Sequence, residues 1–207
     1  MTEFDMQQFA RLGVATVYEA AGKQGLIDVP LIQIVPGSRV AGRARTVRCG
    51  QGDNLMVHAA LAQVQPGEVL VLTMPEPDAY ALVGELLATQ AQAHGAAALL
   101  VDAAVRDVEE LRALGLPTWS RWIRARGASK SAVGTINEPV AVGGTIIAPG
   151  DIIVLDADGA VAVEAASAAG VLDAALARET REASLRKQLL EGAFTYDLHG
   201  LRAAIEK

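Results

Sequence analysis

GELLATQAQAHGAAALLVDAAVRD, residues 84–107, is the stretch that decides the fold of this chain. Its first part, residues 84–94, is alanine-rich and helical in character, and Gly95 follows where a helix favours a left-handed closing residue. The run AAALLV at residues 96–101 is apolar without interruption, as in a strand covered on both faces. Polar groups therefore gather at the start of the helix and at the exit of the strand, residues 102–107. An α/β fold usually binds small molecules at such places.

The composition describes an acidic, apolar chain. Of its 207 residues, 51% are hydrophobic, and 18 basic against 24 acidic residues give a formal net charge of −6. This apolar content excludes intrinsic disorder, and the scattered arginines form no basic stripe of the kind that binds nucleic acid. The single cysteine cannot form an internal disulfide, the N-terminus lacks the order of a signal peptide, and no apolar run is long enough for a membrane span. We therefore expect a cytoplasmic protein without a nucleic-acid or membrane partner.

Before the central stretch, the sequence predicts two short helices in residues 1–25 and a strand in residues 39–49 with one solvated face. Thr16 and Glu19 have the spacing of a capping box, which is the structural interpretation of Glu19. Residues 55–64 have the periodicity of an amphipathic helix.

Asp53 or Asn54 precedes that helix as its N-cap, and His58 within it is expected to be a packed or surface residue rather than a ligand. Pro66-Gly67 and Pro149-Gly150 predict type II turns, which we expect at hairpin corners. Structural roles are expected for the remaining candidates, Cys49, His94 and His199.

After the central stretch, a helix at residues 108–114 and a short strand at 116–119 complete a βαβ-like unit. The pattern is β from Gly134, with a hairpin turn at Asp158-Gly159, and helical over residues 165–191. No linker divides the chain. We predict one α/β domain over its whole length, ending in a helical tail.

The helix start offers an anion site, because the first-turn amides have no partners inside the helix. Gly84 lets a ligand approach the backbone, and the amides of Leu86 and Leu87 would bind a carboxylate. Arg106 offers a planar fork for a carboxylate or an enolate oxygen, and Asp107 is a hard oxygen ligand for Mg²⁺ or Mn²⁺.

Glu85 adds a second carboxylate, able to hold a water as acid or base. Together these groups would bind a 2-oxo acid and stabilise its enolate, the usual route to cleaving a carbon–carbon bond beside a carbonyl. Structural interpretations stay open: Asp107 with Glu110 has the spacing of a helix cap, and Arg106 with Glu85 would form a surface ion pair.

The run GELLATQAQAHGAAALLVDAAVRDVEEL resembles the signature of the RraA-like family. The resemblance continues through GVATVYEA, GDNLMVHAAL, PGEVLVL and GGTIIAPGDIIVLDADGAVAV, and into REASLRKQLLEG and FTYDLHGLR of the tail. The family's enzymes are divalent-metal aldolases of 4-hydroxy-4-methyl-2-oxoglutarate and 4-carboxy-4-hydroxy-2-oxoadipate, and many also decarboxylate oxaloacetate. The resemblance implies a swivelling β/β/α domain with mixed sheet layers and flanking helices. It also implies trimers or pairs of trimers with the site at a subunit interface.

By this resemblance, the turn at residues 84–87 would bind the pyruvate carboxylate through backbone amides. Arg106 would contact the pyruvyl oxygen, and Asp107 would hold Mg²⁺ or Mn²⁺ partly through waters. Asn54 is similar to a polar residue that the family places near the substrate.

Three glutamates complete what the resemblance implies. Glu19 and Glu182 resemble acidic groups that a neighbouring subunit contributes. Glu85 is a departure, because the aldolases carry aspartate at this position, with the same spacing to Arg106. The longer arm of glutamate would move the proton-shuttling water, so we expect the pyruvate and metal sites to tolerate the change better than full aldolase activity.

The predicted function is a class II pyruvate aldolase, an oxaloacetate decarboxylase, or both, acting on a small 2-oxo acid through a pyruvate enolate. A Schiff-base aldolase is a rival, but it needs a desolvated lysine, and none of Lys23, Lys130, Lys187 and Lys207 lies in a strongly apolar strand. A regulator that binds and inhibits a ribonuclease, as some relatives do, is the alternative from another class. A methyltransferase has no support, since no glycine-rich nucleotide loop follows a strand.

Overall fold

The central strand of the structure, a computed structural model that describes residues 1–206, is β5 (Ala98–Val105). It includes most of the predicted apolar run and continues beyond the predicted end at residue 101. All of its residues are buried. Within residues 1–206 it belongs to a nine-stranded sheet of order β1 (Ile32–Gln33), β6 (Thr118–Ile123), β5, β3 (Glu68–Thr73), β2 (Val40–Arg48), β10 (Ile152–Asp156), β11 (Gly159–Val163), with β4 (Ala81–Val83) beside β5 and β7 (Thr135–Ile136) beside β2.

The sheet is mixed. Strands β2, β3, β5 and β6 run parallel, whereas β10 pairs antiparallel with both β2 and β11. One face carries the short helices α2 (Leu55–Leu61), α3 (Glu85–Ala93) and α4 (Val108–Leu114), whose apolar sides pack on the parallel strands. The opposite face packs around buried Trp119 and the hairpin of β8 (Val140–Val142) and β9 (Thr145–Ile147). The predicted α/β class is confirmed.

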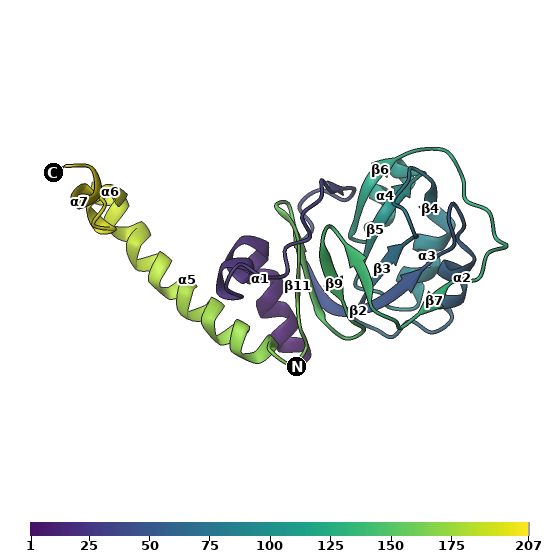
Figure 1. The fold of residues 1–207 in the computed structure, drawn as a ribbon, viewed down its shortest axis with the longest axis horizontal. Helices are drawn as coiled ribbons and strands as arrows, with labels where there is room; N and C mark the ends of the chain where they lie inside the picture. The colour runs from purple at the N-terminus through teal and green to yellow at the C-terminus, as the bar shows by residue number, and fades with distance from the viewer. Residues whose placement is uncertain (207) are drawn as a thin grey trace.

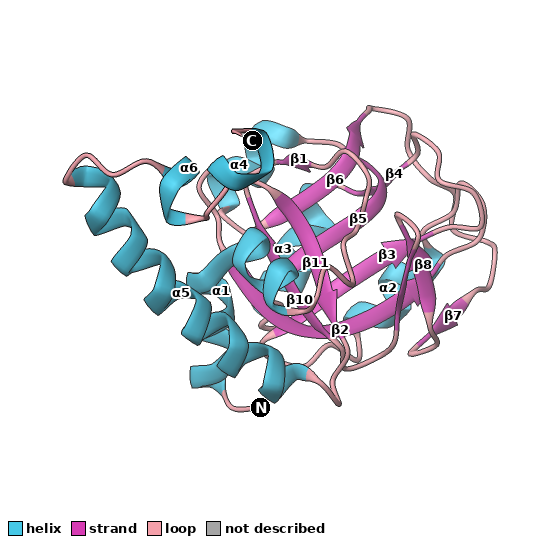
Figure 2. Cartoon of the chain, turned by 60° about the vertical axis from the view of Figure 1, so that its left-hand side comes forward, coloured by secondary structure: helices cyan, strands magenta, loops and turns pink. Residues whose placement is uncertain are grey.

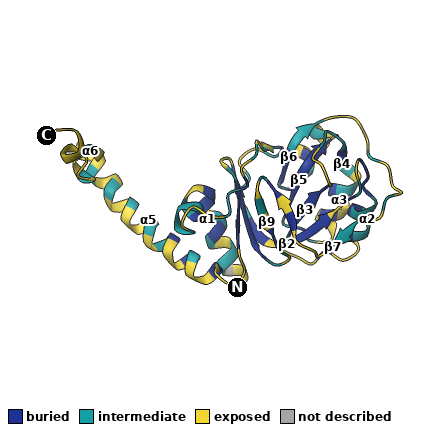
Figure 3. Ribbon diagram, viewed as in Figure 1, coloured by how far each residue is buried: buried dark blue, intermediate teal, exposed yellow. Residues whose placement is uncertain are grey.

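Two longer helices, α1 (Glu3–Ala20) and α5 (Ala168–Leu190), lie side by side on the outer side of β10 and β11 (Figures 1 and 2). The distal half of α5 extends away from the sheet and is largely exposed (Figure 3), and α6 (Thr195–Leu198) and α7 (Arg202–Ile205) lie at its far end. In the part of the chain described, no helix combines the length and the apolar character that a membrane crossing requires.

The N-terminal helix contains the two predicted helical segments, which meet at a non-helical Gly13 with φ 81°. The proposed capping box at Thr16 and Glu19 is wrong, because Thr16 lies inside the second segment. The capping box forms instead between Thr2 and Asp5, at the start of the helix. Capping needs a residue outside the helix, and here the kink, not Thr16, marks the second start.

Among the described residues of β2, the predicted solvated face is exposed only at Arg43. Arg45, on that face, is buried at 8% exposure and its Nη2 donates to Glu68 Oε1 at 2.9 Å. Alternation of polar and apolar residues cannot distinguish a solvated side chain from one neutralised by a buried partner. Both Pro-Gly turns form, with Gly67 and Gly150 at φ 85° and 87°, but they are not hairpin corners. One joins α2 to β3, and the other joins the β8–β9 hairpin to β10. The hairpin predicted at Asp158-Gly159 is confirmed.

Candidate functional site

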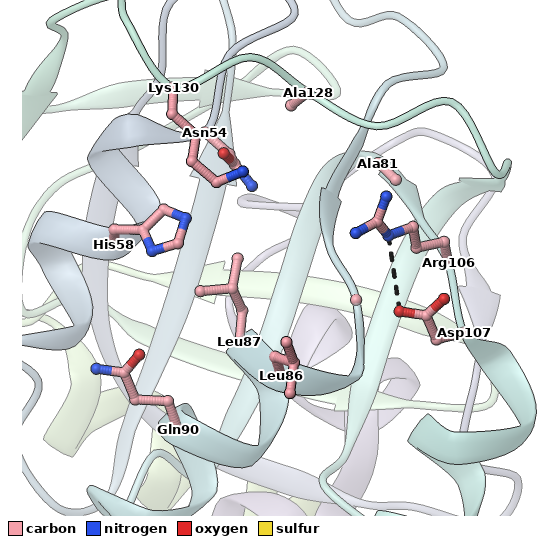
Figure 4. A pocket seen from close by; sticks show the side chains of 11 residues that line it. Asn54, His58, Ala81, Leu86, Leu87, Gln90, Arg106, Asp107, Ala128 and Lys130 are labelled. Carbon is pink, nitrogen blue, oxygen red and sulfur yellow. Dashed lines mark ion pairs between the residues drawn. The ribbon is translucent and has the colours of Figure 1, made fainter.

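A cavity of about 270 Å³ lies where β4 and β5 end, between α2, the start of α3 and the loop that follows β6 (Figure 4). The ends of parallel strands are where open α/β sheets commonly bind ligands. The lining residues come from four separate segments of the chain. They are Asn54, His58, Ala81, Gly84, Leu86, Leu87, Gln90, Arg106, Asp107, Ala128 and Lys130.

The start of α3 forms one wall of the cavity. Among the described residues, the backbone amides of Leu86 and Leu87 donate no hydrogen bond, as expected for the first turn of a helix. The amide of Glu85 donates to Asp107 Oδ2 at 3.1 Å. A Cβ at position 84 would overlap that same oxygen, so any larger residue would displace the carboxylate from the start of the helix. The structure therefore places two free amides beside an acidic side chain.

Asp107 sits at the N-cap position of α4 with φ 57° and ψ 48°, and its side chain makes no capping hydrogen bond. The interpretation of Asp107 with Glu110 as a helix cap is therefore wrong. A non-glycine residue in this left-handed region costs on the order of 1–2 kcal/mol. The conformation turns the carboxylate toward the start of α3 instead of its own helix, and such strain is typical of functional positions.

Arg106 extends along the same edge of the cavity. Its Nε lies 3.6 Å from Asp107 Oδ2, and the two side chains are 50% and 42% exposed, so both remain open to a ligand. The alternative ion pair between Arg106 and Glu85 does not form among the described residues. Glu85 Oε1 instead accepts a hydrogen bond from Thr89 Oγ1 at 3.0 Å, and Glu85 does not line the cavity.

Asn54 and His58 face this edge from α2, one helical turn apart (Figure 4). Asn54 is 7% exposed and its Nδ2 donates to Leu82 O at 3.0 Å. Asn54 Oδ1 and His58 Nε2 are buried without a hydrogen-bond partner in the described chain, which costs about 1–3 kcal/mol for each group. Groups left in this state beside a cavity are suited to binding a polar ligand.

The donor set fits a water-rich Mg²⁺ or Mn²⁺ site. Within residues 1–206, no three carboxylate, imidazole or thiolate side chains converge on one point, so an all-protein cage is absent there. Mg²⁺ usually binds through one or two carboxylates, with waters and substrate oxygens completing its shell. Asp107 supplies such a carboxylate on an open cavity, and Asn54 Oδ1 supplies a neutral oxygen without a partner.

The two other predicted acids lie away from the cavity of their own chain. Glu19 is on α1 and Glu182 on α5, and both pair with Arg178, at 3.6 and 2.7 Å. A role for these glutamates at the site therefore requires a neighbouring subunit and stays a prediction.

Sequence reasoning missed the cavity residues Ala81, Gln90, Ala128 and Lys130, and it assigned no site role to His58. Gln90 lies one turn after Leu86 and Leu87 on α3, so helical spacing contained the signal for it. Lys130 comes from an exposed loop and had no such signal.

Of the two cap candidates, Asn54 occupies the N-cap position of α2 but its side chain makes no capping hydrogen bond. Asp53, one residue earlier, supplies the side-chain acceptor: its Oδ1 accepts from the amide of Leu55 at 2.8 Å. Burial alone would raise the pKa of Asp53. Hydrogen bonds from the Ser129 hydroxyl and from the amides of Ser131, Leu55 and Ala132 outweigh burial and hold that pKa well below its usual range. The carboxylate is therefore ionised and firmly bonded at neutral pH.

Residues 14–162 match the family model described as Aldolase/RraA, RraA-like. The chain belongs to the RraA-like family. It is 38% identical over 125 residues to the "Putative 4-hydroxy-4-methyl-2-oxoglutarate aldolase" of Halalkalibacterium halodurans, a match that covers 60% of each chain. The chain therefore spans less than two thirds of the length of that relative.

Two solved structures show the same RraA-like fold over most of their length. A crystal structure of an uncharacterized protein from Pseudomonas syringae has a TM-score of 0.82 and 25% identity, covering 94% of this chain and 96% of that one. Streptomyces coelicolor RraAS2, described as an unusual member of the RNase ES inhibitor RraA protein family, has a TM-score of 0.81 and 28% identity, covering 90% and 98%. The fold predicted from the resemblance is confirmed.

Gly84→Ala is a direct test of the close approach between α3 and Asp107. Gly84 has φ −130°, which alanine adopts freely, so we expect little change in the melting temperature. The added methyl group would displace the Asp107 carboxylate, and in an enzyme that uses this carboxylate, as we propose below, a shift of about 1 Å costs on the order of 100-fold in rate. Steady-state kinetics and thermal unfolding measure the two effects. Gly170→Ala, where nothing lies within 4 Å of the new Cβ, is the control, and unchanged kinetics in Gly84→Ala would contradict the prediction.

Proposed function

We propose that this protein is a divalent-metal-dependent carbon–carbon lyase. It cleaves 4-hydroxy-4-methyl-2-oxoglutarate-type 2-oxo acids to pyruvate, decarboxylates oxaloacetate, or does both. The observation that carries the proposal is the convergence on one cavity of two free helix amides, a guanidinium fork and a carboxylate. These are the groups that bind a 2-oxo acid and stabilise the charge of its enolate. The similarity to the Halalkalibacterium halodurans protein supports the same chemistry.

In this mechanism the amides of Leu86 and Leu87 hold the carboxylate of the 2-oxo acid at the positive end of α3. Arg106 donates to the 2-oxo oxygen and stabilises the negative charge that develops there. Asp107 would hold Mg²⁺ or Mn²⁺, which, when bound, polarises the same carbonyl as a Lewis acid.

The bond that breaks leaves its electron pair on the pyruvate fragment as the enolate, which is then protonated at carbon. Aldol cleavage also requires a base for the substrate hydroxyl, and Glu85 would act through a water because its carboxylate points to Thr89 rather than into the cavity. Decarboxylation of oxaloacetate needs no such base. With glutamate at position 85, we therefore expect decarboxylation of oxaloacetate to be faster than aldol cleavage.

The proposed assembly is a homotrimer or a pair of trimers in the cytoplasm. Glu19 and Glu182 of a neighbouring subunit would then approach the cavity, consistent with their distance from the site of their own chain. Their pairing with Arg178 would orient both carboxylates.

The test is pyruvate release coupled to a dehydrogenase. Oxaloacetate and 4-hydroxy-4-methyl-2-oxoglutarate are supplied separately, with Mg²⁺ or Mn²⁺ and after EDTA treatment. We expect release with metal, loss of at least about 100-fold after EDTA and recovery on adding the metal back, since the Lewis acid supplies several kcal/mol. The ratio of the pyruvate-release rates from the two substrates shows how far Glu85 favours decarboxylation over aldol cleavage.

A regulator of a ribonuclease is the second candidate, supported by the similarity to RraAS2 over 90% of this chain. No pyruvate from either acid with any metal, together with tight binding to a ribonuclease, would favour it. A Schiff-base aldolase has less support, because Lys130, which lines the cavity, is exposed rather than desolvated.

A further inference from the structure

One side of the cavity is formed by the connection between β6 and β7, residues 124–134, which we call the strap. It contributes Ala128 and Lys130 to the cavity lining (Figure 4). Most of its residues are exposed, Lys130 among them. Ala128 packs against the core, and the Ala81 amide donates to Arg126 O at 2.8 Å. Near Lys130 the residues are mostly exposed, so hydrogen bonds make the main contribution to holding this part of the strap.

The hydrogen bonds of residues 129–132 converge on Asp53, which is 1% exposed. Its Oδ2 accepts from Ser129 Oγ and the Ser131 amide, both at 2.7 Å, and from the Ala132 amide at 3.1 Å. Its Oδ1 accepts from the Leu55 amide at 2.8 Å. A single carboxylate thus joins the strap to the first turn of α2.

The backbone reinforces this connection on both sides of Asp53. The amide of Asn54 donates to Ser129 O, and the amide of Ser129 donates to Gly52 O, both at 2.9 Å. Because α2 carries Asn54 and His58, the same anchor sets the strap relative to two other residues of the cavity.

We propose that Asp53 is a positioning residue of this site: its carboxylate anchors the strap so that Lys130 is held at the cavity, where the ammonium group binds an anionic group of the substrate. This inference deepens the proposed function and rests on it, in that an anionic 2-oxo acid occupies the cavity. Asp53 itself does not line the cavity. Charge-assisted bonds to backbone amides are stronger than neutral ones, so a carboxylate suits this anchoring role.

Asp53→Asn is the informative variant because it keeps the shape of the side chain. In either orientation of the amide, its NH2 group faces backbone donors, at Leu55 or at Ser131 and Ala132. Ser129→Ala removes only one of the bonds and serves as a milder variant should Asp53→Asn fold poorly. The control is Asp158→Asn, at an exposed hairpin turn.

Hydrogen exchange of the full chain tests the anchor without any ligand. We expect amides of residues 129–132 to exchange about tenfold faster or more in Asp53→Asn, since the strap opens locally, while β3 and β5 keep their protection. Ser129→Ala should show a smaller effect in the same direction, and Asp158→Asn none. Unchanged protection of the strap in Asp53→Asn would overturn the proposal.

Binding of 2-oxoglutarate, measured by calorimetry in the presence of Mg²⁺, tests whether Asp53 acts through Lys130. This 2-oxo acid is informative because it has a second carboxylate besides the one assigned to the amides of Leu86 and Leu87, and the proposed reaction does not cleave it. We expect Asp53→Asn and Lys130→Ala each to weaken binding about tenfold, and the double variant to be within about twofold of Lys130→Ala. Fully additive losses would overturn the proposal, because a general destabilising effect does not depend on Lys130. If the unmodified protein binds neither 2-oxoglutarate nor pyruvate, the proposed function fails, and hydrogen exchange alone tests the anchoring role of Asp53.

Discussion

Replacing Asp107 with asparagine is expected to lower kcat/KM for pyruvate release by about 1000-fold, because a loss of about 4 kcal/mol corresponds to three factors of ten in rate. The carboxylate is the charged ligand that we propose for the divalent ion, and asparagine removes the charge while keeping the shape. The variant should also lose most of the difference between assays with metal and with EDTA. Steady-state kinetics over a range of Mg²⁺ concentrations measures both effects.

Asparagine is the right replacement because Asp107 has φ 57°, a region that asparagine tolerates better than most residues. Its carbonyl oxygen still accepts from the Glu85 amide, so the start of α3 should keep its place. Glu109→Gln, an exposed change on the same helix, is the matched control and should retain full activity. Full, EDTA-sensitive activity in Asp107→Asn would refute a metal site at Asp107.

Replacing Arg106 with lysine is expected to lower kcat/KM by about 100- to 1000-fold, the usual loss when one donor to a developing oxyanion is removed. Lysine keeps the charge but loses the planar fork that contacts two oxygens at once. Since this contact strengthens as the enolate forms, kcat should fall more than KM rises. Single-turnover measurements with oxaloacetate separate the chemical step from product release.

Arg124→Lys is the control for Arg106→Lys. Arg124 is exposed, and its Nη1 donates to the neighbouring Ile123 O at 2.7 Å. Loss of activity in both variants would show that a general change of surface charge, rather than the fork of Arg106, is responsible. An equal rise in KM with unchanged kcat would limit Arg106 to substrate binding.

Local signals were sufficient for most of the secondary structure. Alanine-rich periodicity and Gly95 predicted α3, the apolar run predicted the start of β5, and Asp158-Gly159 predicted the hairpin between β10 and β11. These features depend on neighbours within a few residues. The errors concern partners far along the chain: Arg45 is buried because Glu68 on another strand neutralises it. The three-residue strand β4 exists because β5 pairs with it.

The site divides in the same way. Gly84, Leu86, Leu87, Arg106 and Asp107 were predicted because a strand exit and the helix starts beside it place polar groups together. The sequence could not decide between a capping role and a site role for Asp107. Only the tertiary structure shows that its carboxylate turns away from its own helix.

The sequence by itself determined the α/β class and the RraA-like family, and it predicted the candidate residues at the starts of α3 and α4, because these follow from local periodicity and motifs that are contiguous in the chain. Only the tertiary structure decided that Asp53 joins the strap to α2, that Lys130 reaches the cavity, and that Glu85 bonds to Thr89. The physical reason is that a polar side chain can bond to any suitable partner within reach. The partner depends on how distant segments pack, and the local sequence does not predict that packing.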